Sequence, residues 1–283
     1  MNDYRDARSE GVSAVILSLN EVSNIKRCIE SLHWCREIVV VDSGSCDGTQ
    51  EYAKSLGARV LVNRPNGRFL ISNQRNWALN NIVFGTEWIL FVDADEAIGP
   101  KCRAEIQNQI SQDNAIDAYE LAPRYWFMGR WLKKTQGFPC WHPRLLKKTN
   151  VRFEGGVWES FCNYTRVGRL QEPYEHYAFS KGVDDWLARH IRYADWEAER
   201  IVCFLRSNKL EDLKTTRFVR LRAFAAQVWP ARPLLRFLQK YLMQGGISEG
   251  WQGLLFCLMM AMYELITVAK VIEILRKEDG LSL

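Results

Sequence analysis

Acidic side chains recur in this sequence directly after runs of apolar residues. The runs are VSAVILS, EIVVV and WILFV, and the acids that follow them are Glu21, Asp42, Asp47, Asp93 and Asp95. Asp93 and Asp95 are two positions apart, so at the end of an extended strand their side chains point to the same side. Two carboxylates in that arrangement suit a hard divalent cation that also binds phosphate oxygens. The sequence therefore predicts a metal-assisted site for a phosphorylated ligand.

Some of these acids also have a simpler interpretation. Asp42 could cap the helix that follows it, and Asp47 with Gly48 could form a turn. Turn formation alone does not require both Asp93 and Asp95. Burying carboxylates together costs on the order of several kcal/mol per group unless a cation neutralises them. We therefore expect a divalent metal ion or a cationic partner at this site.

Short apolar runs and polar helical segments alternate from residue 12 to about residue 110. The runs have no polar face, which is typical of strands in a parallel sheet that helices cover on both sides. We expect strands at 12–20, 37–45, 58–64 and 87–95, and helices at 24–35, 49–58 and 72–82. In such sheets ligands bind beyond the carboxyl ends of the strands, where the acids lie. The expected fold class is α/β with a mainly parallel sheet.

The chain changes character twice after this region. The segment 113–180 is irregular and rich in aromatic residues, and it suits short strands and loops that offer Trp and Arg side chains to a polar, ring-shaped ligand. The segment 181–283 has a helical pattern. No internal repeat and no flexible Gly/Ser linker separates these parts. We therefore expect three regions, at 1–112, 113–180 and 181–283.

Composition excludes several other classes of protein. Of the 283 residues 47% are hydrophobic and 25% charged, with 8 prolines and 18 glycines, which excludes a collagen-like, disordered or low-complexity chain. The 8 cysteines form no CxxC pair and no cluster at zinc spacing, and MNDYRDARSEG has no apolar stretch that resembles a signal peptide. We expect buried, reduced thiols in a cytoplasmic protein.

The C-terminal region contains a basic block. The net charge of +5, from 38 basic and 33 acidic residues, is too small to indicate a nucleic-acid partner. Between Leu213 and Ser248, however, there are basic residues and no acidic one. They are Lys214, Arg217, Arg220, Arg222, Arg232, Arg236 and Lys240.

An apolar run follows the basic block. LLFCLMMAMY (254–263) is interrupted by Glu264 and is shorter than the about 20 apolar residues that a membrane-spanning helix needs. Together with the basic block it predicts a helix that lies in the interface of an anionic membrane. The alternative is a core helix that packs on the catalytic domain or on a second subunit of a homo-oligomer.

The order of the motifs resembles a known family. VILSLNE, IVVVDSGSCDGT, QRNWAL and WILFVDADE are similar to the inverting family 2 glycosyltransferases, which have a GT-A fold. HPRLLKK, EHYAF and the helical C-terminus resemble the subgroup that extends lipopolysaccharide cores and related lipid-linked glycans. The resemblance implies that 1–112 is the nucleotide-sugar-binding half of a GT-A domain and 113–180 its acceptor-side half. It also implies that 181–283 is a helical membrane-associating region.

The resemblance assigns donor-binding roles to residues near the first two strand ends. Asn20 and Glu21 stand where the family contacts the nucleobase and ribose. Asp42 stands where a family carboxylate reads the base or ribose, and Asp47 lies in the DGT turn of the family.

Further donor contacts are implied for residues in the QRN and HPR segments. Gln74, Arg75 and Asn76 lie in the segment that approaches the nucleotide and the phosphates or sugar of the donor. The alternative for Arg75 is a salt bridge on a helix surface. Arg144 is a phosphate or acceptor contact in this interpretation.

The resemblance also implies a metal site. Asp93 and Asp95 match the DxD pair of the family, in which Asp95 binds Mg²⁺ or Mn²⁺ directly. His176 aligns with a family histidine that completes the metal or diphosphate site, although a lone histidine is often only structural. A hard cation that bridges the two phosphates neutralises the departing nucleoside diphosphate. Asp95 is therefore expected to contribute to catalysis.

An inverting transfer needs a general base that deprotonates the acceptor hydroxyl. The best match is Glu159, at a position where relatives often carry a His-Glu pair. Trp158 replaces that histidine in this sequence. Glu154 and Glu96 are the alternatives for the base.

The expected function is transfer of a sugar from a nucleotide-sugar, such as a UDP-hexose, to a lipid-linked or lipopolysaccharide-core glycan. The transfer should depend on a divalent metal and occur at the inner face of the cytoplasmic membrane, without nucleic acid as a partner. The alternative is a non-catalytic membrane adaptor that binds nucleotide-sugars. A nucleotidyltransferase would need a Gly-rich basic loop and a Rossmann dehydrogenase a GxGxxG motif, and VILSLNEVSN contains neither.

Overall fold

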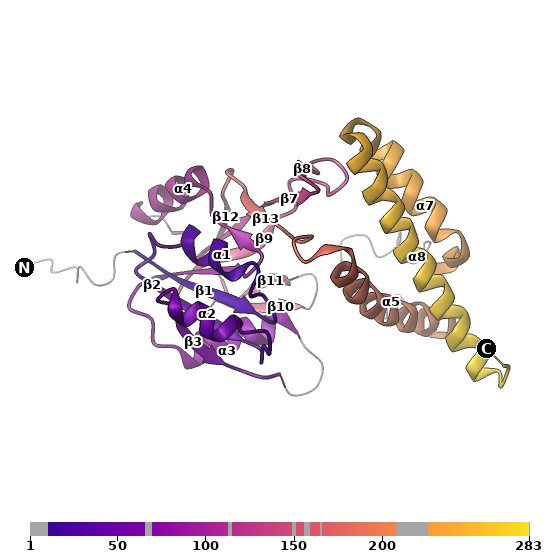
Figure 1. Cartoon of the computed structure of the whole chain (residues 1–283), viewed down its shortest axis with the longest axis horizontal. Helices are drawn as coiled ribbons and strands as arrows, with labels where there is room; N and C mark the ends of the chain where they lie inside the picture. Colours follow the sequence, from indigo (N-terminus) through magenta and orange to yellow (C-terminus); the bar gives the residue numbers. More distant parts are fainter. Residues whose placement is uncertain are drawn as a thin grey trace, which may run out of the picture. The chain divides into compact units, whose positions relative to one another are not determined.

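The chain folds into two compact units. The computed structural model describes residues 11–65, 70–112, 115–148, 151–155, 159–164, 166–207 and 226–282. The first unit comprises Met1–Trp126 and Phe138–Ser180, and the second comprises Phe127–Gly137 and Lys181–Leu283 (Figure 1). The segment Phe127–Gly137 thus belongs to the helical unit, although it lies within the range 113–180 that was expected to form the acceptor-side half.

A seven-stranded sheet forms the centre of the first unit. Its strand order is β12-β6-β9-β4-β1-β2-β3. The strands are β1 (Val12–Ser18), β2 (Glu37–Asp42), β3 (Arg59–Val62), β4 (Trp88–Asp93), β6 (Ala118–Leu121), β9 (His142–Lys147) and β12 (Val167–Arg169). The first four are mutually parallel, β12 is parallel to β6, and β9 is antiparallel to both β4 and β6. The mainly parallel α/β sheet is confirmed.

Helices and apolar clusters cover both faces of this sheet. The helices of the unit are α1 (Ile25–Ser31), α2 (Thr49–Ser55), α3 (Ile71–Asn81) and α4 (Pro100–Ser111). In β4, Leu90 belongs to the core cluster that contains α1, whereas Phe91 belongs to the cluster that contains Ala78 of α3. Successive strand residues point to opposite faces. Two buried faces therefore explain why the strand is apolar at every position.

Short strands complete the first unit. β5 (Glu96–Ala97), β7 (Pro123–Phe127) and β13 (Tyr174–His176) belong to a second sheet, in which β13 is antiparallel to β5. β10 (Arg152–Gly155) and β11 (Glu159–Cys162) form an antiparallel pair, and β8 (Arg130–Trp131) lies in the segment that belongs to the helical unit. These short strands bring residues from the segment 113–180 to the end of β4, where the acids lie.

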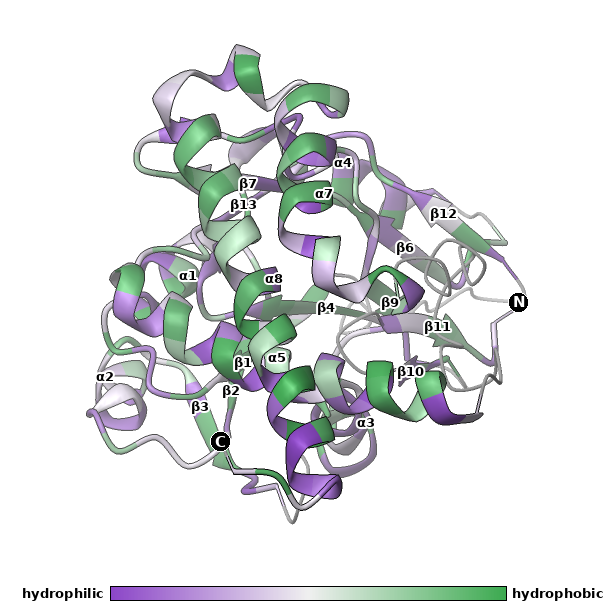
Figure 2. Cartoon of the chain, turned by 90° about the vertical axis from the view of Figure 1, so that its right-hand side faces the viewer, coloured by the Kyte–Doolittle hydropathy of each residue, from purple (hydrophilic) through white to green (hydrophobic). Residues whose placement is uncertain are grey.

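The second unit is helical. It contains α5 (Gly182–Ser207), η2 (Trp229–Ala231), α7 (Arg232–Leu238), η3 (Gln239–Met243), η4 (Gly246–Glu249) and α8 (Gly250–Glu278). Figure 2 shows that α7 and α8 are hydrophobic over much of their length. By length and composition, the helical segment Gly246–Glu278 is long and apolar enough to cross a membrane. The expectation that the apolar run is too short to span is therefore wrong, because the helix continues beyond Glu264.

The described part of the basic block is bound inside the helical unit. Arg232 and Arg236 form ion pairs with Glu264, at 2.6 and 2.7 Å. Lys240 donates a hydrogen bond to the carbonyl oxygen of Thr135, and burial lowers the pKa of Lys240 to about 8. The expectation that these three cations face an anionic membrane is therefore wrong, since protein groups already bind them. The other predicted cations, Lys214, Arg217, Arg220 and Arg222, lie outside the described residues.

The cysteines are only partly buried. All 8 are free, as expected for a reduced protein, and Cys28, Cys102 and Cys257 are buried. Cys46 and Cys203 are exposed, so the expectation of buried thiols is wrong for these two. Cys46 lies in a loop and Cys203 on the exposed face of α5, so neither thiol is part of the core.

Replacing Glu264 with Gln should destabilise the protein by about 3 kcal/mol, because the buried Arg232 loses the nearer of its two carboxylate partners and keeps only Glu197. The carboxylate of Glu264 is 1% exposed and pairs with two guanidinium groups. The measurement is urea unfolding of the full chain followed by circular dichroism. Glu273→Gln is the control, since Glu273 pairs with Lys277 on the surface of the same helix and should leave the midpoint nearly unchanged. Equal midpoints for the two variants would show that the ion pairs in α8 are not important for stability.

Candidate active site

The carboxyl ends of β1, β2 and β4 meet at one edge of the sheet. The backbone N–H of Ala94 donates to the carbonyl oxygen of Leu17 at 3.1 Å, which joins the ends of β4 and β1. The hydroxyl of Ser18 donates to Asp42 at 2.8 Å, which joins the ends of β1 and β2. The parallel order of the strands produces this convergence, as the sequence predicted.

Asp42 organises the loop after β2. Its buried carboxylate accepts hydrogen bonds from the hydroxyls of Ser18 and Ser45, from the backbone N–H groups of Gly44 and Ser45, and from the amide of Gln50. Burial alone would raise the pKa of Asp42, but these donors stabilise the ionised form and leave the pKa below its usual range. Asp42 therefore shapes the loop, and its oxygens already have partners within the protein.

Asp47 has a similar local role. Its carboxylate accepts hydrogen bonds from the backbone N–H of Val22 and from the N–H and hydroxyl of Thr49. Thr49 begins α2, so Asp47 fixes the start of this helix and ties it to the loop after β1. These contacts agree with the simpler interpretation of the sequence, in which Asp47 and Gly48 form a turn.

Asn20 and Glu21 form the facing loop after β1. Asn20 has a φ of 54°, a left-handed conformation that asparagine tolerates better than most residues. Its side-chain oxygen accepts a hydrogen bond from the backbone N–H of Cys46, while Glu21 accepts one from the side chain of Asn24. Cys46 and Asn20 are both exposed, so this edge of the site is open to solvent.

Gln74 and Asn76, on α3, connect elements around the site. Gln74 donates from its amide to the hydroxyl of Ser43 at 3.0 Å and to the carbonyl of Asn63 at 2.9 Å. Asn76 donates to the carbonyl of Phe153 and accepts from the N–H of the same residue, at 2.7 and 2.9 Å. Both atoms of the Asn76 amide are thus bonded to β10. This side chain anchors β10, and the donor contact that the sequence implied for Asn76 stays a prediction.

Arg75 occupies the centre of a buried ion cluster. Its side chain is fully buried, so the alternative of a surface salt bridge is wrong. The guanidinium group lies 3.0 Å from a carboxylate oxygen of Asp93 and 3.2 Å from Oε2 of Glu159, and it donates to the carbonyl of Pro143 at 3.1 Å. Arg75 therefore connects the end of β4 with β11.

Arg144, from β9, completes this cluster. Its guanidinium lies 3.0 Å from the second oxygen of Asp93 and 2.7 Å from Oε1 of Glu96. Oε2 of Glu96 accepts a hydrogen bond from the backbone N–H of Asp93, so Glu96 closes the turn at the end of β4. Burial would raise the pKa of Asp93, but the two arginines hold this pKa below its usual range.

The two aspartates of the DxD motif have different partners. Both oxygens of Asp93 contact arginines, whereas Oδ2 of Asp95 lies 3.4 Å from Nε2 of His176. Backbone pairing fixes this contact, because Tyr177 donates to the carbonyl of Asp95 and β13 pairs with β5. The described residues contain no group of three acidic, histidine or cysteine side chains that could hold a metal. Of the three predicted ligands, only Asp95 and His176 therefore face each other.

Glu159 contacts one terminal nitrogen of the Arg75 guanidinium, and Asp93 contacts the other. The side chain of Glu159 is 6% exposed, and among the described residues Oε1 has no hydrogen-bond partner. Burial raises the pKa of Glu159 above 4.5, and the charge of Arg75 opposes this rise only in part. The alternative bases differ, since Glu154 is exposed and bonded to Ser160, and both oxygens of Glu96 are bonded within the protein. Trp158 lies outside the described residues.

Comparison with known proteins decides the family. The family model described as "Glycosyl transferase family 2" matches residues 13–177, which is more than half of the chain. The chain belongs to this family. It is thus a glycosyltransferase, and the non-catalytic adaptor interpretation is set aside.

The relatives of this family 2 glycosyltransferase include proteins of similar length. The chain is 26% identical to the lipopolysaccharide core biosynthesis glycosyltransferase LpsC of Rhizobium meliloti (strain 1021), over 93% of this chain and 92% of that protein. It is 25% identical to an uncharacterized glycosyltransferase of Rickettsia typhi, over 93% of this chain and 87% of that protein.

Solved structures also align with this glycosyltransferase. One is glucosyl-3-phosphoglycerate synthase from Mycobacterium tuberculosis in complex with Mn²⁺, UDP and glucosyl-3-phosphoglycerate, at 18% identity and a TM-score of 0.39. The alignment covers 49% of this chain and 57% of the solved chain, so it spans little more than half of the latter.

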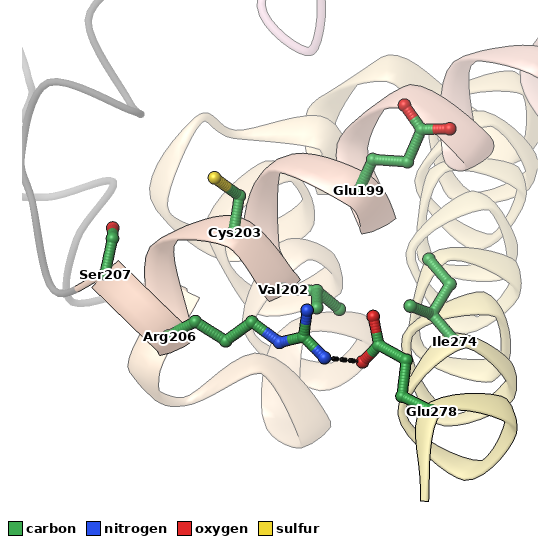
Figure 3. A pocket seen from close by; sticks show the side chains of 7 residues that line it. All are labelled: Glu199, Val202, Cys203, Arg206, Ser207, Ile274 and Glu278. Atoms are coloured by element: carbon green, nitrogen blue, oxygen red, sulfur yellow. Dashed lines mark hydrogen bonds and ion pairs between the residues drawn. The ribbon is translucent and has the colours of Figure 1, made fainter. Parts of the chain in front are cut away.

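A separate pocket lies in the helical unit of this glycosyltransferase. Side chains of α5 and α8 line it, and an ion pair between Arg206 and Glu278 crosses it (Figure 3). The residues that the sequence singled out for chemistry are absent from its lining. The candidate site is therefore the group of residues at the strand ends, and this pocket is separate from it.

Replacing Arg75 with Met should destabilise this glycosyltransferase by about 3–5 kcal/mol, because Glu159 then loses its counter-charge and Asp93 keeps only Arg144. Arg75→Lys keeps the charge but cannot contact both carboxylates as a fork, so it should restore only part of the stability. Urea unfolding midpoints of the three proteins measure the effect. A midpoint for Arg75→Met that equals that of the unmodified protein would contradict the role of Arg75 as the central cation.

Proposed function

We propose that this glycosyltransferase transfers a hexose with inversion from a UDP-hexose to a lipid-linked or lipopolysaccharide-core glycan, in a reaction that depends on Mg²⁺ or Mn²⁺. The observation that carries the proposal is the carboxylate of Glu159, which is buried, has a raised pKa and keeps Oε1 without a partner among the described residues. A buried acceptor oxygen of this kind suits the hydroxyl of an incoming ligand. UDP is the commonest carrier in the family that the sequence resembles.

Glu159 acts as the general base in this proposal. An efficient base has a pKa that approaches the pH at which it works, and burial shifts Glu159 in that direction. Arg75 holds Oε2 at 3.2 Å, which leaves Oε1 to accept the proton of the acceptor hydroxyl. Arg75 is therefore a positioning residue in the proposal. This role replaces the donor contact that the sequence implied for Arg75.

Asp95 and His176 fit a divalent metal ion as its protein ligands. They offer a carboxylate oxygen and an imidazole nitrogen 3.4 Å apart, and both side chains are partly exposed, at 17% and 16%. Mg²⁺ in nucleotide-dependent enzymes commonly uses one or two protein ligands together with substrate phosphates, so a third protein ligand is not required. The bound cation would neutralise the charge of the departing UDP. Asp93 contributes by fixing the turn that carries Asp95.

Asn20, Glu21, Asp42 and Asp47 form the nucleoside end of the proposed donor site. The hydrogen bonds within this group hold the loops after β1 and β2 against each other. Asn20 is exposed and Glu21 half-buried at the edge of these loops. Gln74 supports the loop after β2 through Ser43, while Arg144 supports Asp93 and Glu96.

The acceptor class rests on similarity over nearly the full length. The relative from Rhizobium meliloti is named a lipopolysaccharide core biosynthesis glycosyltransferase and aligns with the helical unit as well as the catalytic unit. An acceptor of that kind is attached to lipid. The proposal therefore includes a peripheral location at the inner face of the cytoplasmic membrane, where nucleotide-sugars are available.

Glu159→Gln should bind the nucleotide-sugar normally and transfer sugar about 10² to 10⁴ times more slowly, because the amide keeps the size of the side chain and removes its basicity. Transfer from radiolabelled UDP-hexoses measures the rate, and calorimetry measures donor binding. Only the ionised carboxylate is a base, so kcat/KM of the unmodified enzyme should rise with pH through a pKa above 4.5.

Glu154→Gln and Glu96→Gln are the matched comparisons for this variant. Glu154→Gln should transfer sugar at the normal rate, because its side chain is exposed. If Glu159→Gln were fully active while one of these two variants lost transfer, the base would have to be reassigned.

Asp95→Asn should lower transfer at least about 100-fold, since loss of a charge on the metal removes several kcal/mol of stabilisation. The variant should also need a higher Mn²⁺ concentration for half-maximal donor binding, measured by titration. Asp184→Asn, at the start of α5, is the control for removal of an acidic side chain. Unchanged metal dependence in Asp95→Asn would remove Asp95 from the metal site.

A further inference from the structure

The outward face of α8 is a continuous apolar stripe. Its members recur three, four or seven positions apart and are between 37% and 60% exposed. They are Trp251, Leu254, Leu258, Met262, Leu265 and Ile272. With 3.6 residues per turn this spacing places them on one side of the helix. A helix that faced only water would carry charged or polar side chains at these positions.

The opposite face of α8 packs inside the helical unit. Phe256, Cys257, Thr267 and Val271 are buried there, and α8 contacts both α5 and α7. Glu264 lies on this inner face and pairs with Arg232 and Arg236. Since Glu264 is the charged residue of the sequence from Gly250 to Ala269, turning it inward leaves the stripe without charge.

Exposed cations lie beside the N-terminal end of the stripe. Arg130, Lys133 and Lys134 come from the segment Phe127–Gly137, which belongs to the same unit. Glu249, the residue before α8, accepts hydrogen bonds from the backbone N–H groups of Lys134 and Thr135, and this contact fixes the segment against η4. The guanidinium of Arg130 donates to the carbonyl oxygen of Ser248 and the ammonium of Lys134 to its hydroxyl, but both side chains remain exposed, unlike those of Arg232, Arg236 and Lys240.

More apolar side chains surround these cations. Met128, Met243 and Ile247 are exposed by 47%, 83% and 61%. Trp251 marks the boundary between the cations and the stripe, and tryptophan is enriched where apolar lipid meets headgroups. The stripe and its basic end therefore match the two layers of an anionic lipid leaflet, acyl chains and phosphates.

One face of α8 is exposed and the other packs on helices, which disfavours a membrane-spanning orientation. A spanning α8 would take the helices bound to its inner face into the bilayer, and α5 carries charged residues along its whole length, from Asp184 to Arg206. A helix that lies in the plane of the interface exposes only one stripe to lipid. From Trp251 to Ile272 that stripe is about 32 Å long, at about 1.5 Å per residue.

Charge disfavours a parallel pair of two copies of the chain at this surface. In a parallel pair the cations beside Trp251 would meet their own equivalents. In an antiparallel pair they would meet the other end of α8, which carries acidic as well as basic residues, so charge does not exclude that arrangement. Lipid phosphates offer these cations a uniformly negative surface.

We propose that the stripe of α8 inserts into the interface of an anionic membrane, with α8 parallel to the membrane plane and Arg130, Lys133 and Lys134 against the lipid phosphates. This proposal rests on the proposed function for its acceptor and gives the membrane association a defined surface. In this proposal the stripe and its three neighbouring cations bind the membrane. Arg232, Arg236 and Lys240 of the basic block do not, because their charges are bound inside the unit.

The test is co-sedimentation of the full chain with vesicles of phosphatidylcholine and phosphatidylglycerol, and with vesicles of phosphatidylcholine alone. The double substitution Leu258→Glu with Leu265→Glu should reduce the partition coefficient on the mixed vesicles at least about 10-fold, since two apolar contacts are lost and two charges added. Lys133→Glu with Lys134→Glu should also weaken binding, and this effect should disappear at high salt because the charges are screened. Val83→Glu is the control, because Val83 is 82% exposed and lies in the catalytic unit. This variant should bind the vesicles as the unmodified protein does.

Three results would overturn the proposal. The first is that the unmodified protein binds neither vesicle at low salt. The second is that the double stripe variant binds the mixed vesicles as well as the unmodified protein does. The third is that the unmodified protein is a dimer, and that the stripe substitutions convert it to a monomer without changing vesicle binding. That result would show that a second copy of the chain covers the stripe. Glu159→Gln separates this proposal from the proposed function, because it should lose sugar transfer and keep full vesicle binding.

Discussion

Charge balance at the end of β4 constrains the whole catalytic unit. The chain brings Asp93, Glu96 and Glu159 into a buried space, where ionised carboxylates are unfavourable unless cations neutralise them. Arg75 and Arg144 supply that charge, and each contacts two acids. Because these arginines come from α3 and β9, the helix, the antiparallel strand and the hairpin β10–β11 must all be in place together.

This constraint divides the acidic residues by role. Asp93 and Glu96 have every oxygen bonded within the protein, and they hold the turn. Asp95 and Glu159 lie at the two ends of the same cluster, one beside His176 and the other beside Arg75. The ion pairs of Arg75 and Arg144 thus connect the residues proposed for the leaving-group side and for the acceptor side, and such fixed contacts favour preorganised catalysis.

The sequence predicted the central sheet because its signal is local. Fully apolar runs indicate strands buried on both faces, and parallel strands bring their carboxyl ends to one edge, so the meeting of Asp42 with the loops around Asp47 and Asp93 could be foreseen. The partner of each acid could not be foreseen in the same way. Nothing in the helical pattern of QRNWAL indicates that Arg75 points inward to Asp93 and Glu159, which come from later segments of the chain. The same holds for Glu264, whose arginines lie far earlier in the sequence, so the basic block was interpreted as a free surface.

The pairing of β13 with β5 has a consequence for the order in which the protein forms during synthesis. Asp95 meets His176 only after the ribosome has made the residues up to Tyr177, whose N–H bonds to the carbonyl of Asp95. Contacts so distant along the chain close late, since the loop entropy must be lost before they form. A nascent chain that ends at β4 lacks both the strand β13 and the histidine that contact this turn. The contact between Asp95 and His176 thus depends on a part of the unit that is synthesised about 80 residues after Asp95.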